Sequence, residues 1–202
     1  MKGKYKMNSK ELLNLYKEQI KSNPSLEKAL WIDCDFRFED NIDVNNDILI
    51  CGEESNYEIY PFGKESTGGI YCLLNNNLVG YISSEGGCGI IAKNVNDFFN
   101  LLATCKSLIS YFYKGVFDTF QDFEEKYNKI NNEVKFYNIP LYNKFIADNR
   151  FTTEVSFLYN IFKSAIITEP SFILQADPTQ YSQWDDIFYS EQEEVEKLRQ
   201  KL

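Results

Sequence analysis

Residues 60–105 read YPFGKESTGGIYCLLNNNLVGYISSEGGCGIIAKNVNDFFNLLATC, and this stretch carries most of the structural information in the chain. Two short apolar runs, residues 70–74 and 78–83, are separated by three consecutive asparagines. Asparagine tolerates positive φ, so the asparagines at 75–77 predict a tight turn that joins two strands into a hairpin.

A glycine-rich bend and a capped helix follow the hairpin. Three glycines between residues 86 and 89 bend the chain before a short strand at residues 90–91. Asn94 then stands three residues before Asp97, as an N-cap residue does, and apolar residues recur at helical spacing from 98 to 109. The pattern predicts a helix that packs one face against a core.

The N-terminal third is predicted to begin with two helices. Asn8 and Glu11 have the spacing of a capping box, and the apolar residues after them fit a helix over residues 9–21. Pro24 follows an asparagine, which ends this helix and starts a second one through residue 30.

Strands are expected next. Residues 31–38 alternate between apolar and charged side chains, which predicts a half-buried strand. Residues 48–51 and 57–62 predict two more, and Pro61 would place the end of the latter at a sheet edge.

The chain after residue 114 reads as helical or irregular. A helix is predicted over residues 118–130 and an exposed terminal helix over 191–201, while 151–167 fits either helix or strand. We therefore predict an α+β fold, with a mixed or antiparallel sheet of about five to six strands flanked by helices. Residues 1–110 would form the core, and residues 111–202 a mostly helical extension packed on it as one compact unit.

Composition excludes several classes of function. The chain contains no histidine, which rules out Ser-His-Asp triads, Cys-His dyads and histidine metal sites. Enzymes that use carboxylates or lysine remain possible. The 16 phenylalanines and 14 tyrosines predict an aromatic-rich core.

The five cysteines, at positions 34, 51, 72, 88 and 105, form no CxxC pair and lack zinc-site spacing. We expect buried free thiols and no metal or cofactor. No apolar segment follows the basic N-terminus and none is long enough to span a bilayer, so a cytoplasmic location is expected.

Negative charge is concentrated in two segments. Residues 33–58 contain nine acids and one base, and residues 177–196 contain seven acids and no base. Such segregation attracts a basic partner and repels nucleic acid and anionic membranes, although each run also suits a solvated face that maintains solubility.

The segment 60–105 resembles the SUKH superfamily, which includes bacterial toxin-immunity proteins and relatives of fungal cell-wall-synthesis regulators. The resemblance covers less than a quarter of the chain. An element of the family that joins a helix to the first strand is not found upstream, and residues 110–202 lie outside the pattern. The resemblance rests on these matching stretches: Gly68-Gly69-Ile70-Tyr71, the run Val79-Gly80-Tyr81-Ile82-Ser83-Ser84-Glu85, Ile90-Ile91-Ala92, and the helix start Asn94-Val95-Asn96-Asp97-Phe98.

The resemblance implies a protein that binds other proteins and performs no chemistry. As an immunity protein it would occlude a basic toxin, expected to be a nuclease, through an acidic surface. An alternative is an intracellular scaffold or regulator, for instance in cell-envelope synthesis; an immunity gene is expected to lie beside a toxin gene. The residues we expect to contact the partner are Glu39, Asp40, Asp43, Glu53, Glu54 and Glu58, with Trp184, Asp185 and Asp186 as a second patch.

Several of these features have other interpretations. The glycines at 86–89 lack the Lys and Ser/Thr of a phosphate-binding loop, which favours a simple turn. Glu85 is either a functional acid or one bonded by nearby N–H groups. Acids such as Glu53 and Glu54 could form an acid–base pair with Asp40 or Asp43, but no spacing supports it. Trp184 is either an interface anchor or a packing residue.

Overall fold

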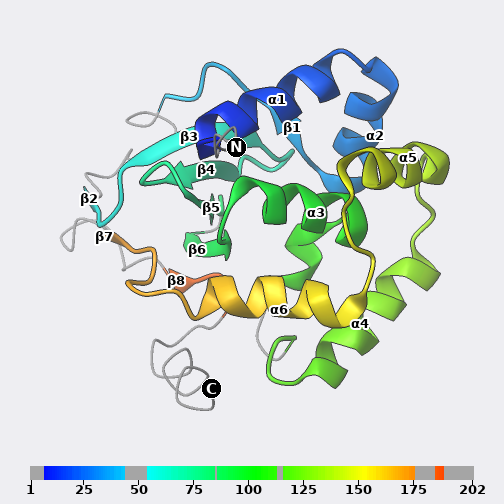
Figure 1. Ribbon diagram of the computed structural model, residues 1–202. Helices are drawn as coiled ribbons and strands as arrows, with labels where there is room; N and C mark the ends of the chain where they lie inside the picture. Colours follow the sequence, from blue (N-terminus) through cyan, green and yellow to red (C-terminus); the bar gives the residue numbers. More distant parts are fainter. Residues whose placement is uncertain (1–6, 44–53, 85, 113–115, 176–184, 189–202) are drawn as a thin grey trace, which may run out of the picture.

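A six-stranded sheet runs through the protein (Figure 1). This computed structural model describes residues 7–43, 54–84, 86–112, 116–175 and 185–188. In spatial order the strands are β1 (Arg37–Phe38), β3 (Ile59–Lys64), β4 (Ile70–Leu74), β5 (Leu78–Ile82), β6 (Gly87–Ala92) and β8 (Asp185–Asp186). Neighbours from β1 to β6 are antiparallel, and β8 runs parallel to β6. The expected α+β fold with a mixed sheet is thus confirmed.

The central hairpin forms as the asparagines predict. Ile70 pairs with Ile82, and Leu74 pairs with Leu78. Asn75 and Asn76 have φ values of 48° and 60°, and the Asn77 N–H donates to the Leu74 carbonyl at 3.1 Å. Two residues with positive φ between paired strands match the twist of a type I′ turn.

Helices make up most of the remaining structure. They are α1 (Ser9–Lys21), α2 (Pro24–Cys34), α3 (Val95–Cys105), the 3₁₀ helix η2 (Leu108–Tyr111), α4 (Phe120–Glu133), α5 (Ile139–Asn149) and α6 (Val155–Ile166). Predicted side-chain caps are present in α1, where Asn8 and Glu11 form a capping box, and in α3, where Asn94 Oδ1 accepts the Asp97 N–H at 2.9 Å.

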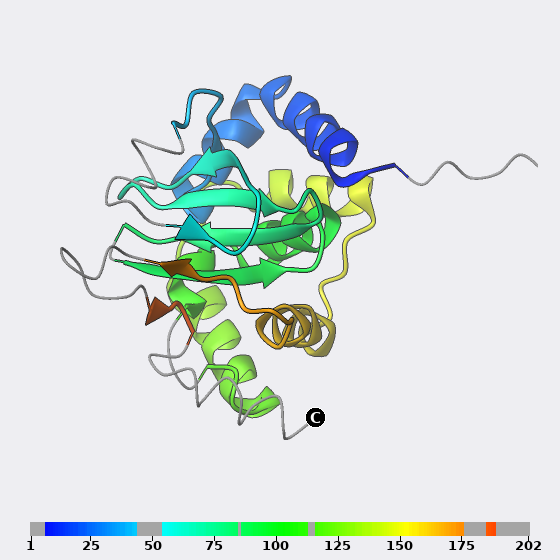
Figure 2. The same cartoon turned by 90° about the vertical axis from the view of Figure 1, so that its left-hand side faces the viewer.

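One face of the sheet packs against α1, α2, α3 and α5, which lie together on one side of it (Figure 2). Strand residues such as Tyr71 and Val79 share this core with Tyr16 of α1 and Phe145 of α5. Aromatic rings dominate it, as the composition predicts. Phe98 and Phe99 have ring centroids 5.0 Å apart, and both rings contact Phe36.

The opposite face is covered by chain that follows α6. On this face of the sheet, the buried residues Cys72 and Ile82 share a second apolar cluster with Phe172 and Leu174. Leu174 belongs to β7 (Leu174–Gln175), which pairs with β2 (Glu54–Ser55) in a separate two-stranded sheet. Helix α6 itself packs along β6 and supplies residues to both clusters. Residues beyond 110 therefore close the core on both faces.

The strand predicted over residues 31–38 is mostly wrong. Helix α2 continues to Cys34, and Asp35, with φ 51°, ends it in a left-handed conformation. Only Arg37 and Phe38 form a strand. The alternation is misleading because Ile32, assigned to the buried face, is 51 % exposed.

Other predicted elements agree to within a few residues. The strand expected over 57–62 is β3. Strand β1 pairs only with Gly63 and Lys64 of β3, so Pro61 lies on the part of β3 that β1 does not reach. The helix predicted over 118–130 is α4, and the ambiguous segment 151–167 contains α6. Helix α5 was not individually predicted. The strand at 48–51 and the helix at 191–201 lie outside the described residues.

The described cysteines are buried free thiols, as expected. Burial raises the pKa of both Cys34 and Cys105 to about 12, so both stay protonated. Cys51 lies outside the described residues.

Candidate functional site

The acids that follow β1 lie beside α1. Asp40 is exposed, and its carboxylate forms ion pairs with Lys17 and, at 3.2 Å, with Lys21. Hydrogen bonds from Lys17 and Lys21 hold the pKa of Asp40 below its ordinary value. Glu39 is half-buried, with its carboxylate 3.8 Å from Arg37. Basic neighbours therefore offset part of the negative charge that the sequence predicts here.

Three other predicted contact residues, Asp43, Glu54 and Glu58, are exposed. Glu54 pairs with Gln175 across the small sheet. Glu58 precedes β3, and its backbone N–H donates to Asn75 Oδ1 at 2.9 Å. Within the described part of the chain, no ion pair involves the Glu54 or Glu58 side chain, so their charge faces solvent.

The second predicted patch lies at the other edge of the sheet. Asp185 and Asp186 form β8 and pair with Gly87 and Cys88 of β6. Four strands separate β8 from β1, next to which Glu39 and Asp40 lie. The two patches therefore belong to opposite edges of the sheet. Glu53 and Trp184 lie outside the described residues.

An exposed aromatic ring accompanies the first patch. Tyr60 of β3 is 45 % exposed and lines a small hollow of about 40 Å³ together with Glu39 and Asp40. The Lys10 ammonium lies 4.6 Å from the centre of its ring. A tyrosine flanked by carboxylates has the character of an anchor residue at protein interfaces.

A buried carboxylate that the sequence analysis missed lies at one end of the sheet. Glu65 is only 3 % exposed and closes the turn between β3 and β4. Its Oε1 accepts hydrogen bonds from the Gly69 N–H at 2.7 Å, from the Thr67 hydroxyl and, at 3.4 Å, from the Tyr81 hydroxyl. Burial raises its pKa, but the bonds from Thr67 and Gly69 outweigh this and leave the pKa below its ordinary value.

Asp35 supports the same turn from α2. Its two carboxylate oxygens accept hydrogen bonds from the backbone N–H and the hydroxyl of Ser66, each at 2.9 Å. The only sequence signal for this bonded turn is a carboxylate followed by small turn residues, in Glu65-Ser66-Thr67. A carboxylate can accept hydrogen bonds from the N–H groups of such residues. Nothing local shows that Glu65 is buried.

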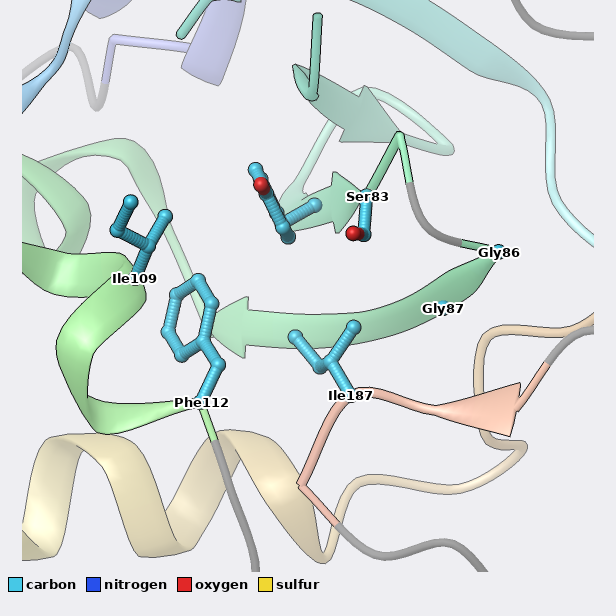
Figure 3. Close-up of a pocket in the computed structure, with 7 residues that line it drawn as sticks. Ser83, Gly86, Gly87, Ile109, Phe112 and Ile187 are labelled. Atoms are coloured by element: carbon cyan, nitrogen blue, oxygen red, sulfur yellow. The ribbon is translucent and has the colours of Figure 1, made fainter. Parts of the chain in front are cut away.

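A larger hollow, of about 260 Å³, opens beside β5 and β6 (Figure 3). It lies between the ends of β5 and β6, the 3₁₀ helix η2 and the residue after β8. The described residues that line it are Tyr81, Ser83, Gly86, Gly87, Ile109, Phe112 and Ile187.

The glycine-rich stretch forms the start of β6 rather than a phosphate-binding loop. Gly86 has a φ of +91°, and Gly87 and Gly89 are paired strand residues. A Cβ at Gly89 would lie 2.7 Å from Ile187 Cγ1, so close packing explains this glycine. Only Gly86 therefore lies in a turn, as expected, whereas Gly87 and Gly89 belong to the strand, which begins before the predicted start at residue 90. Glu85 lies outside the described residues.

The carboxylates of the β3–β4 turn are engaged in structural hydrogen bonds. Glu65 and Asp35 both accept hydrogen bonds within this turn, and Glu54 pairs with Gln175 across the small sheet. Among the described residues, no group of three or more Cys, Asp or Glu side chains is placed to hold a metal ion.

No family model, no curated protein and no solved structure matches this chain. None of the helices in the described part of the chain has the length and apolar character that a bilayer span requires.

Proposed function

We propose that this protein is a non-enzymatic immunity protein of the SUKH type, which neutralises a cognate toxin, a nuclease, by one-to-one occlusion in the cytoplasm. The observation that carries the proposal is the pair of exposed carboxylates, Glu54 and Glu58, that no described ion pair neutralises. Glu58 immediately precedes β3, whose exposed Tyr60 stands two residues further on, so negative charge and an aromatic anchor occur at the same end of this strand.

The folding of residues 60–105 is consistent with the proposed family. The segment forms strands β3 to β6 and the capped helix α3, which is the order of elements that the resemblance implies. This agreement concerns the order of elements alone, and the partner is inferred from charge.

Electrostatic attraction supplies the mechanism. A nuclease binds phosphates through a basic face, and an acidic surface on the inhibitor covers that face and excludes nucleic acid. Opposite charges speed association, and salt weakens this effect. Asp40 contributes less than its exposure suggests, because Lys17 and Lys21 already pair with it.

The first experiment is purification of the tagged protein from its own cells at low and high salt, with mass spectrometry of what accompanies it. We expect a basic toxin fragment in near one-to-one ratio that is lost at high salt. Recovery of envelope-synthesis or signalling proteins instead would favour a scaffold or regulator and contradict the immunity proposal.

Charge reversal locates the contact surface. Glu54→Lys combined with Glu58→Lys should abolish protection of toxin-expressing cells. The matched control is Glu125→Lys with Glu133→Lys, since both residues are exposed on α4 and the net charge changes equally. Equal loss of protection in both variants would indicate an effect of net charge alone, and full protection by the first variant would exclude this surface.

A further inference from the structure

Exposed apolar side chains occur together on α2 and on the chain that leads from α4 into α5. Nine large apolar side chains of the described residues are exposed, and four of them lie here: Ile32, Val134, Tyr137 and Ile139. Helices α2 and α5 lie side by side at one end of the molecule, opposite to β2 and β7 (Figure 1). An apolar patch of this kind on a protein surface indicates an interface.

Hydrogen bonds hold the two segments of this surface together. The Tyr137 N–H donates to both carboxylate oxygens of Asp33, at 2.8 and 2.9 Å, and so lies next to the residue that follows Ile32. The Tyr142 hydroxyl donates to the Ala29 carbonyl at 2.6 Å, which fixes α5 against α2. The surface is therefore formed before any partner binds.

Two cations lie over aromatic rings of the same surface. The Lys28 ammonium is 5.4 Å from the centre of the Tyr137 ring, and the Arg37 guanidinium carbon is 4.8 Å from the centre of the Trp31 ring. Trp31 and Ile32 follow Lys28 by three and four residues, so all three share one face of α2. Tryptophan, tyrosine and arginine are the residues that most often dominate the binding energy of protein interfaces.

The charge of this surface indicates what it binds. Residues 27–39 and 133–144 together contain four bases and five acids, a net charge of −1, whereas the whole chain carries −9. A strongly basic or strongly acidic partner gains little from such a mixed surface, but a surface with the same mixture matches it. Because two copies of an acidic chain repel each other, they associate most readily through a face where acids and bases nearly balance.

We propose that this surface, centred on Trp31, Ile32, Tyr137 and Ile139, binds the same surface of a second copy in a two-fold symmetric dimer. In such a dimer every contact occurs twice, and a face that carries both signs of charge is complementary to itself. The dimer leaves the opposite end of the molecule, with β2, open to another partner. The inference does not depend on that partner's being a toxin.

The test is sedimentation velocity of the full-length protein over a range of concentrations, at low and at high salt. We expect a monomer that converts to a dimer as the concentration rises. High salt should favour the dimer, because it screens the repulsion between two chains that each carry −9. Toxin binding should respond to salt in the opposite direction, so either proposal can fail without the other.

Two variants test where the dimer forms. Ile32→Gln and Ile139→Gln should each weaken dimerisation about tenfold, because a symmetric interface loses the apolar contact in both copies. The control is Phe157→Gln, a change of the same kind at a similarly exposed site on α6, which should leave dimerisation unchanged. Amide chemical shifts of the ¹⁵N-labelled protein should change on dilution at residues 28–32 and 137–139.

The outcomes that contradict the dimer are distinct. A monomer at every concentration would overturn the inference, and a protein that co-purifies with wild type but not with Ile32→Gln would then assign this surface to a different partner. A dimer that weakens at high salt would refute the charge argument. A dimer that Phe157→Gln disrupts and the other two variants leave intact would place the interface elsewhere.

Discussion

At the scale of single residues, the least expected feature is Glu65. A carboxylate is rarely buried unless it is bonded or paired, and Glu65 is bonded by Gly69, Thr67 and Tyr81. It joins two strands of the sheet, because Tyr81 lies in β5 whereas Glu65 follows β3. Its contribution is therefore tertiary as well as local.

Replacing this carboxylate should destabilise the fold. Glu65→Gln preserves size but sets an amide NH₂ or a neutral oxygen against N–H and hydroxyl donors, and we expect a loss of about 2 kcal/mol in the free energy of unfolding. Urea titration followed by circular dichroism measures this loss. Glu58→Gln, at an exposed site, should change stability by less than about 0.5 kcal/mol. A Glu65→Gln protein as stable as wild type would exclude this role.

The effect of Glu65→Gln on the free energy of unfolding should also depend on pH. The folded-state pKa of Glu65 lies below its ordinary value of 4.5, so the charged form contributes stability in full above pH 4.5. This contribution disappears as the pH falls through the folded-state pKa. The stability difference between wild type and Glu65→Gln should therefore shrink below pH 4.5, and a difference that grew on acidification would contradict the assignment.

At the scale of elements, the β4–β5 hairpin depends on its two left-handed asparagines, which have different surroundings. Asn76 has a φ of 60°. Asn75 differs from it because its side chain also accepts a hydrogen bond from the Glu58 N–H, and this bond ties the turn to the start of β3.

These surroundings predict opposite effects of glycine. Asn76→Gly relieves the left-handed strain and should stabilise the protein by about 0.5 kcal/mol. Asn75→Gly relieves the same strain but loses the bond to Glu58, and should destabilise it by about 1 kcal/mol. Thermal unfolding of the two variants beside wild type measures both. Identical shifts for the two variants would show that the side-chain bond contributes nothing.

At the scale of the whole molecule, residues 1–110 and 111–202 share one interior. Phe162 of α6 and Phe145 of α5 are buried in the same cluster as the helices of the N-terminal half. Phe172 and Leu174 cover the other face of the sheet. The description of residues 111–202 as an extension therefore understates their part in the core.

A truncated chain of residues 1–110 should consequently fail to fold. It would expose both faces of the sheet where α6 and residues 172–174 now pack, and burial of apolar surface is the main stabilising contribution in a domain of this size. We expect poorly dispersed amide spectra and no cooperative thermal transition, compared with the full chain under the same conditions. A dispersed spectrum with cooperative unfolding would establish 1–110 as an independent domain.

Local chemistry made much of this protein readable from its sequence. The caps at Asn8 and Asn94, the asparagine turn and the glycine bend each depend on residues a few positions apart, so the hairpin, α1 and α3 follow from the chain alone. The exposure of Glu54 and Glu58 also follows from the sequence, because burying an unpaired charge costs free energy. The fold class is the sum of these local features.

Only the tertiary structure decided the rest, because long-range packing sets burial. Residues 31–34 alternate like a strand but are helical, since α2 buries Leu30 and Cys34 against α3 and α5 and leaves Ile32 in solvent. The pairing of Asp40 with α1, the burial of Glu65 and the hollow beside η2 each bring together segments distant in sequence. No spacing within one segment encodes such contacts, because they form only when the sheet and helices are assembled.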